Sequence, residues 1–111
     1  MAVQVSLNTS ANPPVTVNPR VHDVNNGNQT IKWERGSNQT FTFTSLTGLP
    51  NPPFGTPSIS ASEISITDNN TAAAAYGYTI VVTLNNVQYS TTPSQPNPTE
   101  QSNNGPIINN R

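Results

Sequence analysis

His22 is the only histidine of the chain, and Asp23 follows it directly. A Ser-His-Asp hydrolase needs an acid that orients its histidine, but adjacent residues of a strand point to opposite faces. A zinc or copper site needs three or four ligands, and the chain has no cysteine to add to this one imidazole. We therefore expect His22 to be a solvent-facing residue before a turn. On this basis we predict a protein that is not an enzyme and that has no cofactor.

The remaining carboxylates are scattered along the chain at Glu34, Glu63, Asp68 and Glu100. A glycosidase needs two carboxylates that face each other across a cleft, and Glu34 with Glu63 is a conceivable pair. The solvated faces of two strands explain the same residues without any catalysis. We favour that second interpretation.

The segment Asp68-Asn69-Asn70 offers three oxygen-bearing side chains in a row. Such oxygens are the ligands that Ca²⁺ prefers, but the twelve-residue calcium loop with its closing Glu is missing. Asp and Asn side chains also bond their own backbone in turns. A turn is therefore the favoured interpretation, and a calcium site is the alternative.

Trp33 and the tyrosines could form a flat platform on which a sugar ring stacks. Trp33 alternates in phase with Ile31, however, and large aromatic side chains usually fill cores. We predict that Trp33 is buried. Its predicted core neighbours occupy in-phase positions of three strands: Ile31, Phe41, Phe43, Ile80 and Val82.

The composition limits the classes of partner. The 111 residues carry four basic and five acidic side chains, for a net charge of −1. Nucleic acids and anionic membranes are bound through clustered positive charge, so neither is an expected partner. We find no signal-peptide pattern and no apolar stretch of the roughly 20 residues that a membrane span needs. The sequence does not indicate whether the protein is cytoplasmic or exported.

Short runs with Val, Ile, Phe, Tyr or Thr at every second position recur between Pro, Asn and Gly. This alternation is typical of half-buried strands. We predict an all-β fold, a single antiparallel immunoglobulin-like sandwich of about seven strands with under a tenth of its residues helical. The sandwich domain should span residues 1–91, followed by a Pro/Ser/Asn-rich segment, 92–111, that can return as a short last strand at 107–109.

One local prediction concerns a tight hairpin. The longest alternating run, from Tyr76 to Leu84, ends at Asn85-Asn86. A two-residue turn there would place Leu84 opposite Val87 and Val82 opposite Tyr89.

The segment from Gly48 to Pro57 contains too many prolines for a helix or a central strand. We expect a stiff surface loop, with Leu49 or Phe54 as its anchor. Leu49, Asn51 and Phe54 are its candidate binding residues. Asn-Pro motifs also interrupt the run at Val15 and Val17, which favours an edge strand or a strand that changes sheets.

The order of these features resembles small bacterial immunoglobulin-like and cupredoxin-like sandwiches. The features are Val24, Gly27, Ile31 and Trp33, then the phenylalanine strand, then the run Tyr76–Val82 with its tight hairpin. The likeness extends to the DP-EP family of short bacterial proteins, in which Asp-Pro follows the hairpin and Ile-x-Asn ends the chain. Thr92-Pro93 and Ile108-Asn109 stand at those places here. The resemblance implies the sandwich fold and no particular activity, and the copper ligands of cupredoxins, a Cys and two His, are not all present.

We therefore expect a non-enzymatic immunoglobulin-like binding or structural module. Function on such a scaffold resides in its loops and edges. The expected partner is a protein or a second copy of the chain, bound through the Gly48–Pro57 loop or through the edge near Val15 and Val17. The alternative is a carbohydrate-binding module that uses surface aromatic and amide side chains.

Overall fold

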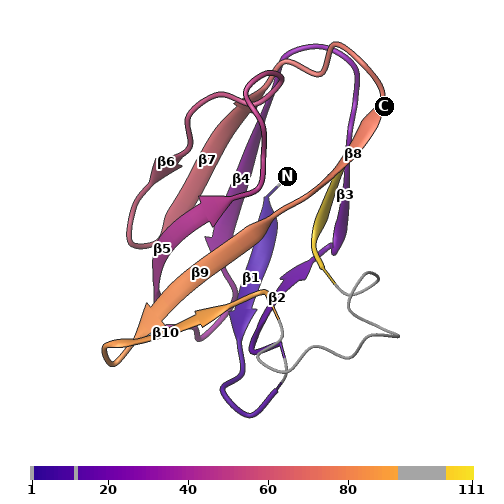
Figure 1. The fold of residues 1–111 in the computed structure, drawn as a ribbon. Helices are drawn as coiled ribbons and strands as arrows, with labels where there is room; N and C mark the ends of the chain where they lie inside the picture. Colours follow the sequence, from indigo (N-terminus) through magenta and orange to yellow (C-terminus); the bar gives the residue numbers. More distant parts are fainter. Residues whose placement is uncertain (1, 12, 93–104) are drawn as a thin grey trace.

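The computed structural model describes residues 2–11, 13–92 and 105–111, and this part of the chain is all-β (Figure 1). Its eleven strands are β1 (Val3–Leu7), β2 (Val15–Asn18), β3 (Val21–Val24), β4 (Gln29–Arg35), β5 (Thr42–Thr47), β6 (Ser58–Ile59), β7 (Glu63–Asp68), β8 (Ala74–Gly77), β9 (Thr79–Leu84), β10 (Val87–Ser90) and β11 (Ile107–Asn110). No described residue is helical, as predicted. It follows that no helix in this part could cross a membrane.

The strands form three sheets. The largest has the order β2-β1-β4-β7-β6, and the two three-stranded sheets have the orders β10-β9-β5 and β3-β11-β8. Two pairs are parallel, β1 with β4 and β3 with β11, so the expectation of purely antiparallel sheets is wrong. The chain leaves β2 for β3 in another sheet before it returns as β4 beside β1, and this crossing makes the β1–β4 pair parallel.

The strand count also exceeds the predicted seven, in part because one predicted strand is divided. The alternating run from Tyr76 to Leu84 is two strands, β8 and β9, which belong to different sheets. The chain changes sheets at Tyr78, whose backbone N–H donates to the carbonyl of Pro106 at 3.2 Å. The side-chain alternation continues through this point, so the sequence pattern does not indicate that β8 and β9 are separate strands.

A β-bulge in β5 explains why its buried residues change phase. The register against β9 shifts between Phe43 and Ser45. The extra residue turns the following side chain to the other face, so Phe43 and Leu46 are both buried although they are three positions apart.

The hydrophobic core confirms the predicted burial of Trp33. Trp33, Ile80 and Val82 have no exposed surface, and their predicted neighbours Ile31, Phe41 and Phe43 are also buried. Phe41 and Phe43 meet edge to face, with ring centroids 5.4 Å apart. The in-phase residues of β4, β9 and the segment around β5 therefore fill one core.

The hairpin between β9 and β10 has the predicted register. Leu84 pairs with Val87, and Val82 pairs with Tyr89. Asn85 and Asn86 have φ of 53° and 65°, the left-handed values that a type I′ turn requires. The buried face does not extend to the first residue of β10, because Val87 is 49% exposed.

The C-terminal residues belong to the same fold. β11 lies between β3 and β8 and pairs with both of them. Ile108 is fully buried and contributes to the core. Most of the predicted Pro/Ser/Asn-rich segment, residues 93–104, lies outside the described residues.

Candidate functional site

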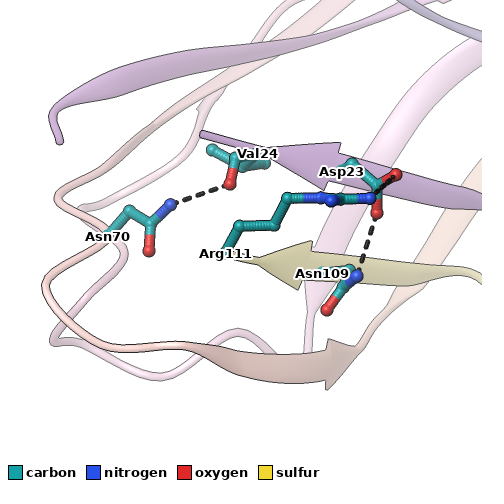
Figure 2. A network of polar contacts seen from close by, with 5 residues as sticks. All are labelled: Asp23, Val24, Asn70, Asn109 and Arg111. Atoms are coloured by element: carbon teal, nitrogen blue, oxygen red, sulfur yellow. Dashed lines mark hydrogen bonds and ion pairs between the residues drawn. The ribbon is translucent and has the colours of Figure 1, made fainter. Parts of the chain in front are cut away.

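His22 and Asp23 are adjacent residues of the edge strand β3, and adjacent residues of a strand point to opposite faces of the sheet. Burial lowers the pKa of the half-buried His22, and the neighbouring charge of Asp23 acts in the opposite direction. Asp23 is exposed and accepts hydrogen bonds from Arg111 at 2.8 Å and from Asn109 at 2.9 Å (Figure 2). These two bonds, that of Arg111 first, lower the pKa of Asp23. The carboxylate of Asp23 is therefore bonded to Asn109 of β11 and to Arg111, the residue that follows β11.

Glu34 and Glu63 lie directly opposite each other on β4 and β7. Directly opposite residues of an antiparallel pair share one face, with Cβ atoms about 5 Å apart. This is a side-by-side arrangement on a sheet, whereas a glycosidase holds a substrate between its two carboxylates. His22 belongs to another sheet, so the structure does not bring these three residues together on one sheet.

Three buried polar side chains, Asp68, Asn70 and Asn110, form the most unusual group in the described part of the chain. We call them the polar cluster. Their exposed fractions are 0%, 1% and 1%. Asn110 donates from Nδ2 to Asp68 Oδ1 at 3.1 Å. Because Asp68 ends β7 and Asn110 ends β11, this bond links two sheets.

The turn after β7 places Asn70 in the cluster. Its backbone N–H donates to Asp68 Oδ1 at 2.9 Å, which confirms the predicted Asx-type turn. Its φ of 41° is in the left-handed region, which asparagine tolerates better than most residues. The turn therefore directs the Asn70 side chain into the protein.

The side chain of Asn70 also holds the turn that follows β3. Its Nδ2 donates to the carbonyl of Val24 at 2.9 Å (Figure 2). It also donates to the carbonyl of Asn25 at 2.7 Å. In return, its backbone carbonyl accepts from Asn26 Nδ2 at 3.3 Å and from the N–H of Gly27 at 3.4 Å. Two loops that are far apart in the sequence are fixed to each other through one residue.

One oxygen of each cluster residue has no hydrogen-bond partner among the described residues: Asp68 Oδ2, Asn70 Oδ1 and Asn110 Oδ1. In the part of the chain that the structure describes, the only ion pair is Arg111–Asp23, so no basic side chain neutralises Asp68 there. Groups of three or more His, Asp or Glu side chains suited to a metal are also absent from that part. The cluster is instead one carboxylate with two amides.

Sequence reasoning identified Asp68 and Asn70 as a turn with calcium as the alternative, but it missed Asn110. Asn110 follows Ile107-Ile108 in a short strand that gave no sign of which neighbours it would meet. Only the pairing of β11 with β3 and β8 brings it to Asp68. The available signal was that Asn110 lies two positions after Ile108 and so shares its face of the strand, which indicates a buried asparagine.

The Gly48–Pro57 segment is the expected loop, but its candidate binding residues have different positions. Phe54 has no exposed surface, forms a β-bridge with Asp68 and packs edge to face on Tyr76 at 5.1 Å. It anchors the loop from inside and is not available to a partner, which corrects its proposed role. Leu49 is half-buried against the core, and Asn51 is exposed.

The expected edge strand near Val15 and Val17 is found as β2, at the end of the five-stranded sheet. A second edge strand, β10, borders a groove. This groove is lined by Thr9, Ala11, Pro14, Gln88, Tyr89, Ser90 and Thr92. It therefore runs between the β1–β2 connection and β10.

The burial of Trp33 removes the main support for a sugar platform. Its indole is enclosed and donates from Nε1 to Tyr78 OH at 3.0 Å. Comparison of the sequence with models of protein families found no match, and comparison with curated proteins found none either.

Proposed function

We propose that the protein is a non-enzymatic binding or structural module with an immunoglobulin-like sandwich fold, and that it binds a second copy of itself through the outer edge of β10, with which no described strand pairs. The observation that carries this proposal is the exposed, uncharged edge of β10. Three features support the fold assignment: Trp33 is buried, β9 and β10 form a tight hairpin, and the chain passes from one sheet to another at Tyr78.

The edge of β10 lacks the usual protection against strand pairing. Natural edge strands carry charges, prolines or bulges, or they are very short. Val87, Gln88, Tyr89 and Ser90 have none of these features, and the first of them exposes 49% of its surface. By contrast, Pro14 and Pro19 flank β2, and β6 has only two residues. Among the described edges, β10 is therefore well suited to accept an added strand.

The groove beside β10 adds side-chain contacts to that backbone edge. Tyr89 and Gln88 line it from the strand, and Ala11 and Pro14 line it from the β1–β2 connection. Strand addition derives affinity from main-chain hydrogen bonds and specificity from such neighbouring pockets. An antiparallel pair of β10 strands would place the groove of each copy beside the added strand of the other.

The charge of the protein does not oppose this pairing. With a net charge of −1, two copies repel each other only weakly. A two-fold symmetric contact also needs only one self-complementary surface. A second copy is thus the occupant that the composition favours.

Sedimentation velocity over an approximately hundredfold concentration range tests the proposal. We expect the wild type to shift from monomer to dimer and Val87→Lys to remain monomeric, because a charge on the edge resists pairing. Val21→Lys is the matched control, since Val21 is 38% exposed on another edge strand, β3. A wild type that stays monomeric throughout, or a Val21→Lys variant with the same defect, would contradict the assignment of β10.

A further inference from the structure

Exchanging the amide nitrogen and oxygen of Asn70 or Asn110 would not give the three unpaired oxygens of the polar cluster hydrogen-bond donors. If the Asn70 amide were reversed, its oxygen would face the carbonyls of Val24 and Asn25, which now accept from its nitrogen. If the Asn110 amide were reversed, its oxygen would face the Asp68 carboxylate. Both nitrogens are therefore fixed by acceptors, and both oxygens are left without a donor.

All three orphaned atoms are acceptors that belong to neighbouring residues. Asn110 Nδ2 and the Asn70 backbone N–H both donate to Asp68 Oδ1, so each asparagine is one hydrogen bond away from the same carboxylate. The second carboxylate oxygen, Oδ2, has no such donor in residues 2–11, 13–92 and 105–111. Burial of an ionised carboxylate without a compensating charge is strongly unfavourable. A cation in contact with these three oxygens would supply both the missing partner atoms and the missing charge.

We propose that the polar cluster binds a calcium ion, with Asp68 Oδ2, Asn70 Oδ1 and Asn110 Oδ1 as its side-chain ligands. Carboxylate and amide oxygens are hard ligands of the kind that Ca²⁺ prefers, whereas zinc and copper favour His and Cys. Mg²⁺ demands a near-ideal octahedron and retains several waters, which a fully buried group accommodates poorly. The sequence favoured a plain turn at Asp68-Asn69-Asn70 and kept calcium as the alternative; the proposal takes up that alternative and adds Asn110 as a ligand.

The charge of the cluster sets the expected affinity. A single carboxylate with two neutral amides leaves the site with a net charge of about +1 when Ca²⁺ is bound. Calcium sites with few charged ligands bind weakly, and we expect a dissociation constant on the order of 10⁻⁴ to 10⁻³ M. The bound ion would join the ends of β7 and β11 and so stabilise two sheets against each other.

The first measurement uses the wild-type protein alone. Equilibrium dialysis should find one Ca²⁺ per chain, and about 10 mM Ca²⁺ should raise Tm by about 5 °C or more above its value in a chelator. The same concentration of Mg²⁺ should have a clearly smaller effect. No bound Ca²⁺ and no shift in Tm would overturn the proposal and would assign the three oxygens to buried water.

Variants then locate the ion. Asp68→Asn removes the charge but keeps the shape, so it should lose the Ca²⁺ response and unfold at or above the Tm of the chelated wild type. Asp23→Asn is the control, because it changes an exposed carboxylate on the neighbouring β3 strand and should keep the full response. A Ca²⁺ response that persists in Asp68→Asn, or that is lost in Asp23→Asn, would place the ion elsewhere.

Discussion

The indole nitrogen of Trp33 donates to the phenolic oxygen of Tyr78 at 3.0 Å, and the two rings meet edge to face with centroids 5.3 Å apart. Trp33 comes from β4, and Tyr78 is the residue at which the chain passes from β8 to β9. One aromatic pair therefore connects the five-stranded sheet to the residue at which the chain passes between the two three-stranded sheets. It satisfies the only polar atom of the indole inside the core.

Trp33→Ala should lower the free energy of unfolding by about 3 to 5 kcal/mol, because it leaves a large cavity in the core. Trp33→Phe should cost less, since it keeps an aromatic ring in the same place. Urea unfolding monitored by circular dichroism measures both. A loss below about 1 kcal/mol for Trp33→Ala would be typical of a surface residue and would contradict the observed burial.

Stability should fall in strongly alkaline solution because Tyr78 is buried. Burial raises its pKa to about 12, while the hydrogen bond from Trp33 acts in the opposite direction. A folded pKa above the unfolded value of about 10 stabilises the protein below pH 10, and this contribution is lost as the pH rises through about 12. Urea unfolding at several pH values should show this loss in the wild type and a smaller one in Tyr78→Phe.

At neutral pH, Tyr78→Phe leaves the indole N–H of Trp33 buried without an acceptor. We expect a cost of about 1 to 3 kcal/mol, the usual penalty for an unsatisfied buried donor. Tyr89→Phe is a suitable control, since Tyr89 is only partly buried. Equal effects of the two substitutions would contradict the special position of Tyr78.

Asn70→Ala should destabilise the protein by about 2 to 4 kcal/mol. The substitution removes both side-chain hydrogen bonds to the loop after β3 and leaves a less tolerant residue at φ 41°. Asn69→Ala changes the adjacent, exposed asparagine and should alter stability by less than about 0.5 kcal/mol. Thermal unfolding of the two variants in chelator separates the turn itself from any bound ion.

Gly48→Ala should cost more than about 1 kcal/mol. Gly48 has φ of 98°, and an added Cβ would lie 3.0 Å from the carbonyl oxygen of Gly77. Gly105→Ala is the matched control, because a Cβ there meets no atom of the described residues within 4 Å. Urea unfolding of both variants should show the difference, and a tolerated Gly48→Ala would mean that the start of the loop is less constrained than described.

Local patterns could be predicted from the sequence, and long-range pairings could not. The hairpin register at Leu84 and Val87 follows from a two-residue turn and is found as predicted. The parallel β1–β4 pair depends on the route of the chain between sheets, which no alternation of side chains records. For the same reason, Asn110 could not be associated with Asp68 before the position of β11 was known.

The β3–β11 pair has a consequence for synthesis of the protein. Its hydrogen-bonded partners, such as Asp23 and Asn109, are separated by 86 positions in the chain. A nascent polypeptide emerges from the ribosome from its N-terminal end, so β3 is exposed to solvent long before β11 has been translated. Contacts of such high sequence separation form slowly. During that interval, β3 is an open strand edge that a chaperone, or another unfinished chain, can occupy.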